Sequence, residues 1–428
     1  MPDMAKTFRD WNPEQAVMFP PTALDLVERD DLVHFVRNLV LEQLDLSEIT
    51  KQYQEERGFP PFHPVMMTAL LLYSYSQGIY SSRRMARACR QRVDYMALTG
   101  MQKPDYRTIS LFRQRHLKAL GLLFGQVLQL CKKAGLVKLG HVALDGTRMR
   151  ANASKHKGMS YRGMKKAEAD LAAEVKGWFE QAERQDREED ERYGVDRQGD
   201  EMPEWVADKQ KRLEKIRQAK AELEAEARAQ AEAAPDPNRT SHKAKPSGVP
   251  EDKVQRNFTD SESRIMKTSE GFIQGYNAQT AVDADSQVIV AELVTNSGSD
   301  VQQMIPLLNQ IRKNVGRQAE EVSADSGYCS ALNLKTLRQR RIRGYVATDR
   351  QKQKNVGRYV QQMRERLGKA AHRSRYRLRK QTVEPVFGHI KFARGFRQFL
   401  LRGIQKVSGE WSLLCTAHNL LKLAAART

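Results

Sequence analysis

Residues 275–294 read GYNAQTAVDADSQVIVAELV, and this stretch decides the fold of the chain. It contains two strand-like runs, Gly275–Val282 and Val288–Val294, with the β-branched and aromatic residues that strands favour. The residues between them, Asp283-Ala-Asp-Ser286, are typical of a turn. The stretch therefore predicts a β-hairpin, and with it a sheet at the centre of the fold.

Shorter apolar runs on both sides of the hairpin predict further strands, at Val142–Leu144, Glu321–Ala324 and Gly344–Ala347. Helices are predicted over Val301–Val315, capped by Ser299 or Asp300, and over Ala331–Arg340, Arg375–Phe392 with an interruption at Pro385, and Ser408–Ala425. This order predicts an α/β fold with an RNase H-like mixed sheet and helices on both faces, although other α/β folds share the order.

An all-helical region precedes the first strand. The pattern of residues 20–135 predicts helices over Pro64–Ser76, Arg83–Arg90, Tyr106–Leu117 and Gly121–Ala134. The second and third of these are basic and carry Arg83, Arg84, Arg87, Arg90, Arg107, Arg113 and Arg115. Two basic helices fit a helix-turn-helix-like DNA-binding bundle, and an ordinary helical domain with solvated arginines fits them equally well.

A highly charged segment separates the first strand from the hairpin. Tyr161–Ala234 carries 15 basic and 20 acidic residues and predicts long exposed helices, arranged as a hairpin that is broken near Tyr193–Pro203. Pro235–Pro250 predicts a flexible linker. We therefore expect an N-terminal helical domain over 1–135, an RNase H-like domain over 136–155 and 255–428, and a charged helical insertion over 156–254.

The net charge of +20 is concentrated at one end of the chain. Residues 331–428 hold 24 basic and four acidic residues, so the whole excess lies in these last 98 positions. Such a concentration favours a phosphate backbone as the partner, and a ribosome-type RNA contact or a basic tail are the alternatives. We expect a cytoplasmic protein. The four cysteines are too far apart for a zinc finger, there is no signal-peptide pattern for secretion, and no apolar run reaches the length of about 20 residues needed to cross a membrane.

Three carboxylates lie beside apolar segments in an order that indicates chemistry. Asp145 follows the strand Val142–Leu144, Asp325 follows Glu321–Ala324, and Glu384 lies in a basic helix with apolar neighbours. Because an unpaired carboxylate in apolar surroundings is unfavourable, we expect each one at the edge of a cleft. Carboxylate oxygens are ligands that Mg²⁺ and Mn²⁺ prefer, and two such ions about 4 Å apart can activate a water or a 3′-hydroxyl against a phosphodiester. Each residue alone also fits a turn Asp or a salt-bridged Glu; the three together favour a metal site.

Several segments carry a resemblance to a known family: Ala143-Leu-Asp-Gly-Thr-Arg-Met-Arg-Ala-Asn-Ala-Ser154, Gly275-Tyr-Asn-Ala-Gln279, Ala324-Asp-Ser-Gly-Tyr328 and Thr382-Val-Glu-Pro-Val-Phe-Gly-His-Ile-Lys391. With them, the chain resembles a bacterial insertion-sequence transposase of the DDE type with an RNase H-like catalytic domain. The helical region from Phe62-His-Pro to Phe112-Arg113 is similar to the domain that precedes catalysis in these transposases. The resemblance covers about residues 20–155 and 255–425.

The resemblance implies that Asp145, Asp325 and Glu384 are the catalytic, metal-binding triad. Many relatives carry a Tyr-x2-Arg-x3-Glu-x6-Lys signature, of which Glu384 and Lys391 keep the spacing. The Tyr-x2-Arg part is present as Tyr376-x2-Arg379, but Arg379 is one residue too far from Glu384, and Lys380 stands at the expected place. Lys391 would lie two helical turns from Glu384 on the same face, where it can hold a phosphate. The residues expected to contact DNA are Lys391, Arg379, Tyr376, Arg394, Arg397, Arg83 and Arg84.

The expected function is therefore a transposase that binds the terminal repeats of its element and performs metal-dependent cleavage and strand transfer. The resemblance implies two Mg²⁺ ions per site (Mn²⁺ as the alternative), double-stranded DNA from element ends and target as partners, a homodimer or larger synaptic assembly, and a nucleoid-associated location in the cytoplasm. A stand-alone metal-dependent nuclease and a catalytically inactive DNA-binding protein are the rival interpretations. In some relatives an insertion before the glutamate helix handles a DNA hairpin; here the insertion follows the first strand, so hairpin chemistry is not carried over.

Overall fold

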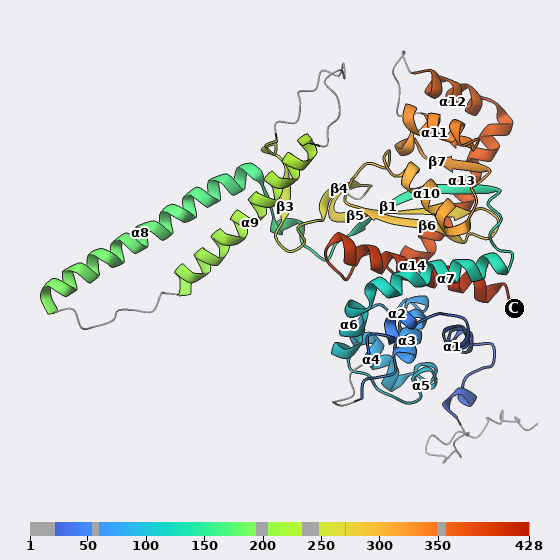
Figure 1. Ribbon diagram of the computed structural model, residues 1–428, viewed down its shortest axis with the longest axis horizontal. Helices are drawn as coiled ribbons and strands as arrows, with labels where there is room; N and C mark the ends of the chain where they lie inside the picture. The colour runs from blue at the N-terminus through green and yellow to red at the C-terminus, as the bar shows by residue number, and fades with distance from the viewer. Residues whose placement is uncertain are drawn as a thin grey trace, which may run out of the picture.

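Figure 1 shows the computed structural model of the chain, which describes residues 22–53, 60–193, 204–232, 248–269, 271–348 and 357–427. A mixed β-sheet lies at its centre, and the predicted hairpin is part of it. Strands β5 (Gly271–Asp283) and β6 (Ile289–Thr295) pair antiparallel. Asp283 closes the turn, because its carboxylate accepts hydrogen bonds from the backbone N–H groups of Lys138, Leu139 and Asp285.

Strand β1 (His141–Arg150) occupies the middle of the sheet. It pairs antiparallel with β5 on one side and parallel with β7 (Glu321–Ala324) on the other, and β7 pairs parallel with β8 (Arg343–Val346). On the far side, β4 (Arg264–Thr268) pairs with the first part of β5 and β6 with its second part. This is the predicted mixed sheet. β1 continues for five residues beyond Asp145, so that residue lies inside the strand and not at its end as predicted.

Helices α10 to α14 pack around the sheet. Their bounds are Met304–Val315 for α10, Ala331–Gln339 for α11, Arg358–Gly368 for α12, Ala370–Gly388 for α13 and Ile404–Ala425 for α14. Gln303 is the N-cap of α10, so neither Ser299 nor Asp300 caps this helix as predicted. The interruption predicted at Pro385 is also wrong, because α13 runs through it. Proline has no N–H for the carbonyl four residues earlier, and the carbonyl of Gln381 accepts a hydrogen bond from the Gln287 side chain instead.

The N-terminal region is helical, as predicted. Its elements are a 3₁₀ turn η1 (Ala23–Leu26), α1 (Leu32–Glu42), α2 (Ser47–Thr50), α3 (Pro64–Ser76), α4 (Ser82–Gln91), α5 (Val93–Thr99), α6 (Tyr106–Arg115) and α7 (Leu117–Lys133). Helices α7 and α14 lie between this region and the sheet (Figure 1), and α14 contacts α3, α7 and β6. One hydrophobic core therefore extends from the N-terminal helices into the sheet.

A buried polar network joins the two regions through that core. Arg113 is only 5% exposed and donates hydrogen bonds to the Tyr75 hydroxyl (3.1 Å) and the Tyr80 carbonyl (3.0 Å). Tyr75 in turn donates to buried Glu410 of α14 at 3.3 Å. Arg113 is thus a structural residue, so neither of the two interpretations of its helix, a DNA-binding surface or solvated arginines, holds for this position. The charge pattern could not show that it faces the core.

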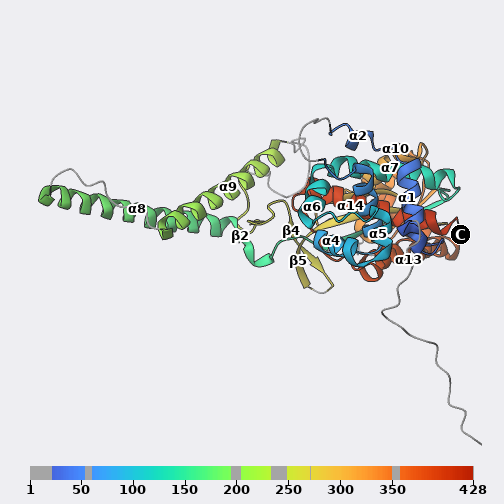
Figure 2. The same cartoon turned by 90° about the horizontal axis from the view of Figure 1, so that it is seen from below.

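The charged insertion forms two long helices that project away from the rest of the molecule (Figures 1 and 2). Helix α8 (Tyr161–Tyr193) and helix α9 (Glu204–Glu232) pack against each other, as predicted, over a small core that includes Met164, Ile216 and Leu223. The short strands β2 (Gly158–Ser160) and β3 (Gln255–Asn257) join the insertion to the sheet region. Most of the predicted linker, Pro235–Pro250, lies outside the described residues.

Among the described residues, no helix combines the length and the apolar character needed to cross a membrane.

Candidate active site

Two neighbouring parallel strands bring Asp145 and Asp325 together. In the pairing of β1 with β7, Leu144 lies opposite Ala324, and the two aspartates are the next residues along each strand. Residues that are opposite in register project to the same face of a sheet, so both carboxyl groups lie on one face where β7 ends. The Oδ1 atom of Asp325 accepts a hydrogen bond from the Gly327 N–H at 2.8 Å, which orients this carboxylate at the start of a 3₁₀ turn.

Arg379 connects the aspartates to the third predicted carboxylate. Its Nη1 lies 2.8 Å from Asp145 Oδ2, and its Nη2 lies 3.5 Å from Glu384 Oε1. The Arg379 side chain is 13% exposed and the Asp145 side chain 17%, whereas the Glu384 side chain is 49% exposed. The structure therefore brings Asp145 and Asp325 together directly, but Glu384 only through Arg379. No group of three or more His, Cys, Asp or Glu side chains in the described part of the chain is arranged to hold a metal ion.

The electrostatics of the site centre on Asp145. Burial raises the pKa of Asp145 to about 6, the Arg379 guanidinium opposes this shift, and the nearby Asp325 and Asp300 add to it. Burial is the largest single influence on the pKa of Arg379 and acts to lower it, but the charges of Asp145, Tyr376, Asp325 and Glu384 together raise it. Several carboxylates converging on one partly buried position create a demand for positive charge. In this structure Arg379 supplies that charge.

Asp300 is a further carboxylate at the site, one to which sequence reasoning assigned only a helix cap. Its Oδ1 accepts hydrogen bonds from the Asn277 and Gln279 side chains, both at 2.7 Å, and its Oδ2 lies 3.3 Å from Arg148 Nη2. The side chain is 5% exposed. Asn277 and Gln279 are two residues apart on β5 and so share one face of the sheet. Two buried amides at this spacing in an otherwise apolar strand are the signal that could have revealed a buried acceptor.

Tyr328 completes this buried network. Its hydroxyl donates a hydrogen bond to Gln279 Oε1, and the side chain is fully buried. Burial, together with the charges of Asp145, Asp300 and Asp325, raises the pKa of Tyr328 well above its usual value. The residue after the Asp325-Ser-Gly turn is therefore a neutral hydrogen-bond donor in the core that supports the site.

A basic cavity of about 820 Å³ opens beside Asp145. Lys391 lines it, and its Nζ donates to the Arg148 carbonyl at 3.3 Å. The regular helix stops at Gly388 and continues as a π-helical turn over His389–Ala393, so the expectation that Lys391 lies two α-helical turns from Glu384 on one face is not met. The other residues that line the cavity include Gly146, Thr147, Arg150, Phe392 and Arg397.

The remaining predicted DNA contacts divide into exposed and buried residues. Arg397 is exposed, with its guanidinium 5.1 Å from the ring centre of the exposed Phe392. Arg83 and Arg84 are exposed on α4, and Tyr376 is half-buried on α13. Arg83 lines a second basic hollow of about 450 Å³ with Arg87, Arg90, Asp105 and Tyr106.

Arg394 does not fit the predicted role. It is only 7% exposed, burial lowers its pKa, and none of its three side-chain nitrogens has a hydrogen-bond partner among the described residues. A side chain enclosed between Tyr80 and the core cannot reach a DNA phosphate in this structure. The basic sequence around it predicted a surface residue because charge alone does not reveal which side of the chain faces inward.

Comparison with known families accounts for two parts of this architecture. A family model described as a transposase DDE domain matches residues 239–420, and a second, described as a transposase domain (DUF772), matches residues 21–115. The first range contains Asp325, Glu384 and Lys391 and begins after Asp145; the second covers the helices from α1 to α6. No curated protein and no solved structure matches the chain significantly.

Proposed function

Since the chain belongs to the insertion-sequence transposases of the DDE type, we propose that Asp145, Asp325 and Glu384 are its catalytic triad. The enzyme catalyses DNA cleavage and strand transfer during transposition. It depends on a divalent metal ion, and its substrate is DNA. The predicted RNase H-like fold and the predicted function are thereby confirmed. The identity of the three residues rests on their positions in the structure.

The observation that carries this proposal is the pairing of Asp145 and Asp325 at the point where β7 ends. Their carboxylates share one face of the sheet, and a cationic group already lies between Asp145 and Glu384. An all-oxygen donor set that accommodates positive charge fits Mg²⁺, and Mn²⁺ as an alternative. When bound there, one or two such ions would supply Lewis acidity to the attacked phosphate and lower the pKa of an attacking water or 3′-hydroxyl.

The chain's own residues orient and bind around that centre. Arg379 holds Asp145 and Glu384 toward each other, and the Gly327 N–H fixes the Asp325 carboxylate. Lys391 and Arg397, which line the adjacent basic cavity, would contact phosphates of the bound strand. Tyr376 would contact the DNA from its position near Arg379 on α13. Hydrolysis and strand transfer are the same in-line displacement with different nucleophiles, so one site serves both reactions.

The N-terminal region, residues 1–135, would recognise the element ends. Arg83, Arg87 and Arg90 surround a hollow on α4 that also includes Tyr106, and Arg84 is exposed on the same helix. We assign these residues to phosphate contacts that hold a terminal repeat while its cleavage point, and later the target DNA, occupies the catalytic region formed by 136–155 and 255–428. Bringing two ends together requires two active sites, which favours a homodimer or larger assembly, working on the nucleoid in the cytoplasm.

The test is cleavage of a duplex that carries the element's own terminal repeat, in the presence of Mg²⁺. We expect the wild type to nick the repeat, and Asp325→Ala to lose at least about 10²-fold in rate, as for removal of one electrostatic stabiliser in an active site. Asp285→Ala is the matched control, because Asp285 is a half-exposed carboxylate in the turn between β5 and β6. Both variants should bind the repeat as the wild type does. Equal cleavage by Asp325→Ala and the wild type would show that the triad is assigned incorrectly.

A further inference from the structure

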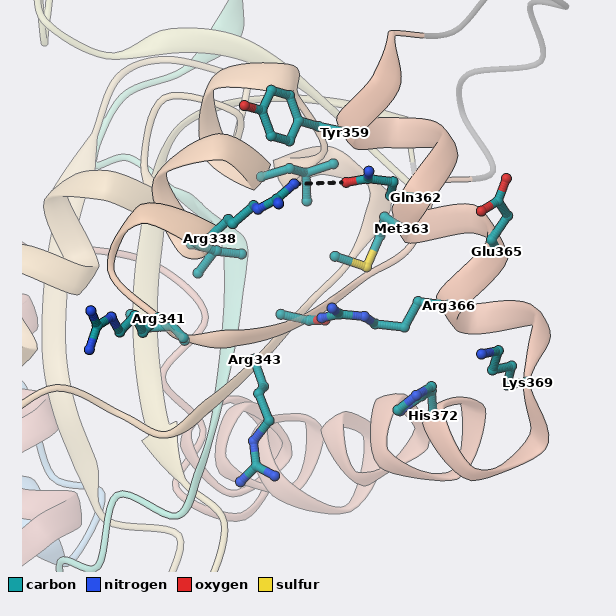
Figure 3. Close-up of a pocket in the computed structure, with 14 residues that line it drawn as sticks. Arg338, Arg341, Arg343, Tyr359, Gln362, Met363, Glu365, Arg366, Lys369 and His372 are labelled. Atoms are coloured by element: carbon teal, nitrogen blue, oxygen red, sulfur yellow. Dashed lines mark hydrogen bonds between the residues drawn. The ribbon is translucent and has the colours of Figure 1, made fainter.

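A further basic pocket lies away from the triad, around the N-terminal end of β8 (Figure 3). We call it the β8 pocket. Its volume is about 720 Å³, and α11, α12, β8 and the start of α13 form its walls. Its charged and polar lining consists of Arg338, Arg341, Arg343, Arg366, Lys369 and Glu365, together with Tyr359, Gln362 and His372. Five cations thus face one carboxylate.

Most of these cations have no acidic partner among the residues that the structure describes. Arg343 forms ion pairs with Glu320 (3.6 Å) and Glu321 (3.3 Å). The other four, Arg338, Arg341, Arg366 and Lys369, form no ion pair with any carboxylate in the described ranges. Glu365 accepts a hydrogen bond from the Gln361 side chain, as its helical neighbour one turn away. Unpaired cations that converge on one hollow favour an anionic ligand.

The pocket is preformed on a tightly packed floor. Leu337, Ile342 and Met363 are buried beneath it, and a methyl group added at Gly344 would lie 2.7 Å from Leu337 Cδ1. Two of the cations are also held in place. Arg366 donates to the Gly344 carbonyl at 3.2 Å, and Arg338 donates to Gln362 Oε1 at 3.4 Å, the dashed line in Figure 3. A ligand therefore meets donors whose positions are largely fixed before it binds.

Arg341 occupies a backbone position that does not favour a side chain. It follows the end of α11 with φ 57°, in the left-handed region. The Ile342 N–H bonds to the Leu337 carbonyl at 2.9 Å, which is the hydrogen bond of a helix end where glycine is usual. An L-residue with a side chain is strained in this conformation, whereas glycine is not. Local stability does not explain this arginine, whereas a ligand in the pocket does.

Helix α13 sets the distance between the β8 pocket and the triad. Lys369 is the N-cap of α13 and His372 is in its first turn, whereas Arg379 on the same helix touches Asp145. At 1.5 Å per residue, seven to ten residues correspond to about 10–15 Å. With a rise of about 3.4 Å per base pair, one duplex would cover this distance in about three to four base pairs. Arg373 and Arg377 are exposed on α13 between the β8 pocket and Arg379.

We propose that the β8 pocket binds backbone phosphates of the same DNA duplex, about three to four base pairs from the bond cleaved at the triad. The distance rests on the proposed function, because it is measured from the triad. The phosphate contact itself rests only on the charges and geometry of the pocket. Five cations dominate the polar lining of the pocket, and cations of this kind contact phosphates, so we assign it to recognition of the backbone and not of sequence.

The experiment measures how binding of the full-length protein to a terminal-repeat duplex depends on salt, without divalent metal so that no cleavage occurs. The pocket variant is Arg341→Gln/Lys369→Gln, which removes two charges. The matched control is Arg312→Gln/Lys313→Gln, which removes an exposed arginine and lysine in the last turn of α10. All four side chains are exposed, and circular dichroism with thermal melting verifies that both variants are folded.

The pocket variant should lower the slope of log affinity against log salt by about 1.8, because each phosphate contact contributes about 0.9. Between 50 and 200 mM salt, the wild type should then lose about tenfold more affinity than the pocket variant. The control should match the wild type. A pocket-variant slope equal to that of the control would overturn the proposal.

Neutral methylphosphonate links, placed one at a time along the duplex, locate the contact. A link three to four base pairs from the nick should weaken binding of the wild type and leave binding of the pocket variant unaffected. If every link that weakens the wild type weakens the pocket variant equally, the pocket does not contact the backbone. If the triad is assigned incorrectly, Asp325→Ala will still cleave the repeat. That outcome would leave the dependence of log affinity on log salt, measured without metal, unchanged.

Discussion

Removing Arg379 should make metal binding depend more steeply on pH. Arg379 lies 2.8 Å from Asp145, whose pKa burial raises to about 6, and its positive charge opposes that rise. In the variant Arg379→Gln the pKa of Asp145 must therefore move further up. A carboxylate must lose its proton before it can ligate a metal, so protons and metal compete for Asp145.

The size of the effect follows from the fraction of Asp145 carboxyl groups that is protonated at pH 6 and at pH 8. With a pKa of about 6, half of the Asp145 carboxyl groups are protonated at pH 6 and almost none at pH 8, which weakens metal binding about twofold between the two pH values. Loss of an adjacent arginine raises a carboxyl pKa by about 1–3 units. Even the smallest of these shifts weakens metal binding about tenfold from pH 8 to pH 6.

The assay is the Mg²⁺ concentration that half-saturates the rise in melting temperature, measured without DNA at pH 6 and pH 8. The ratio of the two concentrations isolates the proton competition, because any direct repulsion between Arg379 and the metal is common to both pH values. Lys380→Gln is the control, since Lys380 is the neighbouring exposed cation at the position where the family signature places its arginine. An unchanged ratio in Arg379→Gln, or an equal increase in Lys380→Gln, would refute the reasoning.

Two further predictions concern buried positions. Arg394→Met should stabilise the protein by about 1–4 kcal/mol, because it replaces a buried guanidinium that has no hydrogen-bond partner among the described residues by an apolar side chain of similar length. We expect a higher melting temperature and unchanged DNA affinity. A lower melting temperature or weaker DNA binding would contradict this prediction. Gly146→Ala should cost about 1–3 kcal/mol and reduce cleavage, because the added methyl group would lie 2.1 Å from Gln279 Nε2 in the Asp300 network. Gly140→Ala, where nothing lies within 4 Å, should do neither, and equal melting temperatures of the two alanine variants would count against this account.

The sheet was predictable because its strands leave local signals. The β5–β6 hairpin has β-branched runs around a turn, and β7 is a short run, Glu321–Ala324, directly before the turn at Asp325. The second half of β1 was not predictable, because Gly146–Arg148 is polar and carries no strand alternation; it is held in the sheet by pairing with β5, a contact that is distant in sequence. Strand β4 was missed for the same reason, since tertiary packing and not local pattern stabilises it. Helix α12 was also missed, although Val360 and Met363 give it a buried side at helical spacing.

The candidate site was predictable to the extent that its residues follow regular elements. Asp145 and Asp325 could be assigned because two apolar runs lead into them, and register then places them together. Asp300 could not, because its partners Asn277 and Gln279 come from β5 and meet it only in the folded chain. Arg113 and Arg394 were assigned to basic surfaces because net charge along the sequence carries no information on burial.

The arginine that departs from the family spacing shows how the fold can absorb such a change. On α13, Arg379, Val383 and Val386 are spaced by four and three residues and so lie on one face, and the two valines are buried against the sheet. Lys380 shares its face with Glu384 and is exposed. A residue at position 380 would therefore reach the glutamate along the outer surface, whereas Arg379 reaches it from the inner face and contacts Asp145 as well. Because the arginine is shifted by one residue, a single cation on the helix contacts both Asp145 and Glu384. The Lys380→Gln control therefore tests whether the contact seen in the structure, or the residue number that the family signature predicts, determines the effect on metal binding.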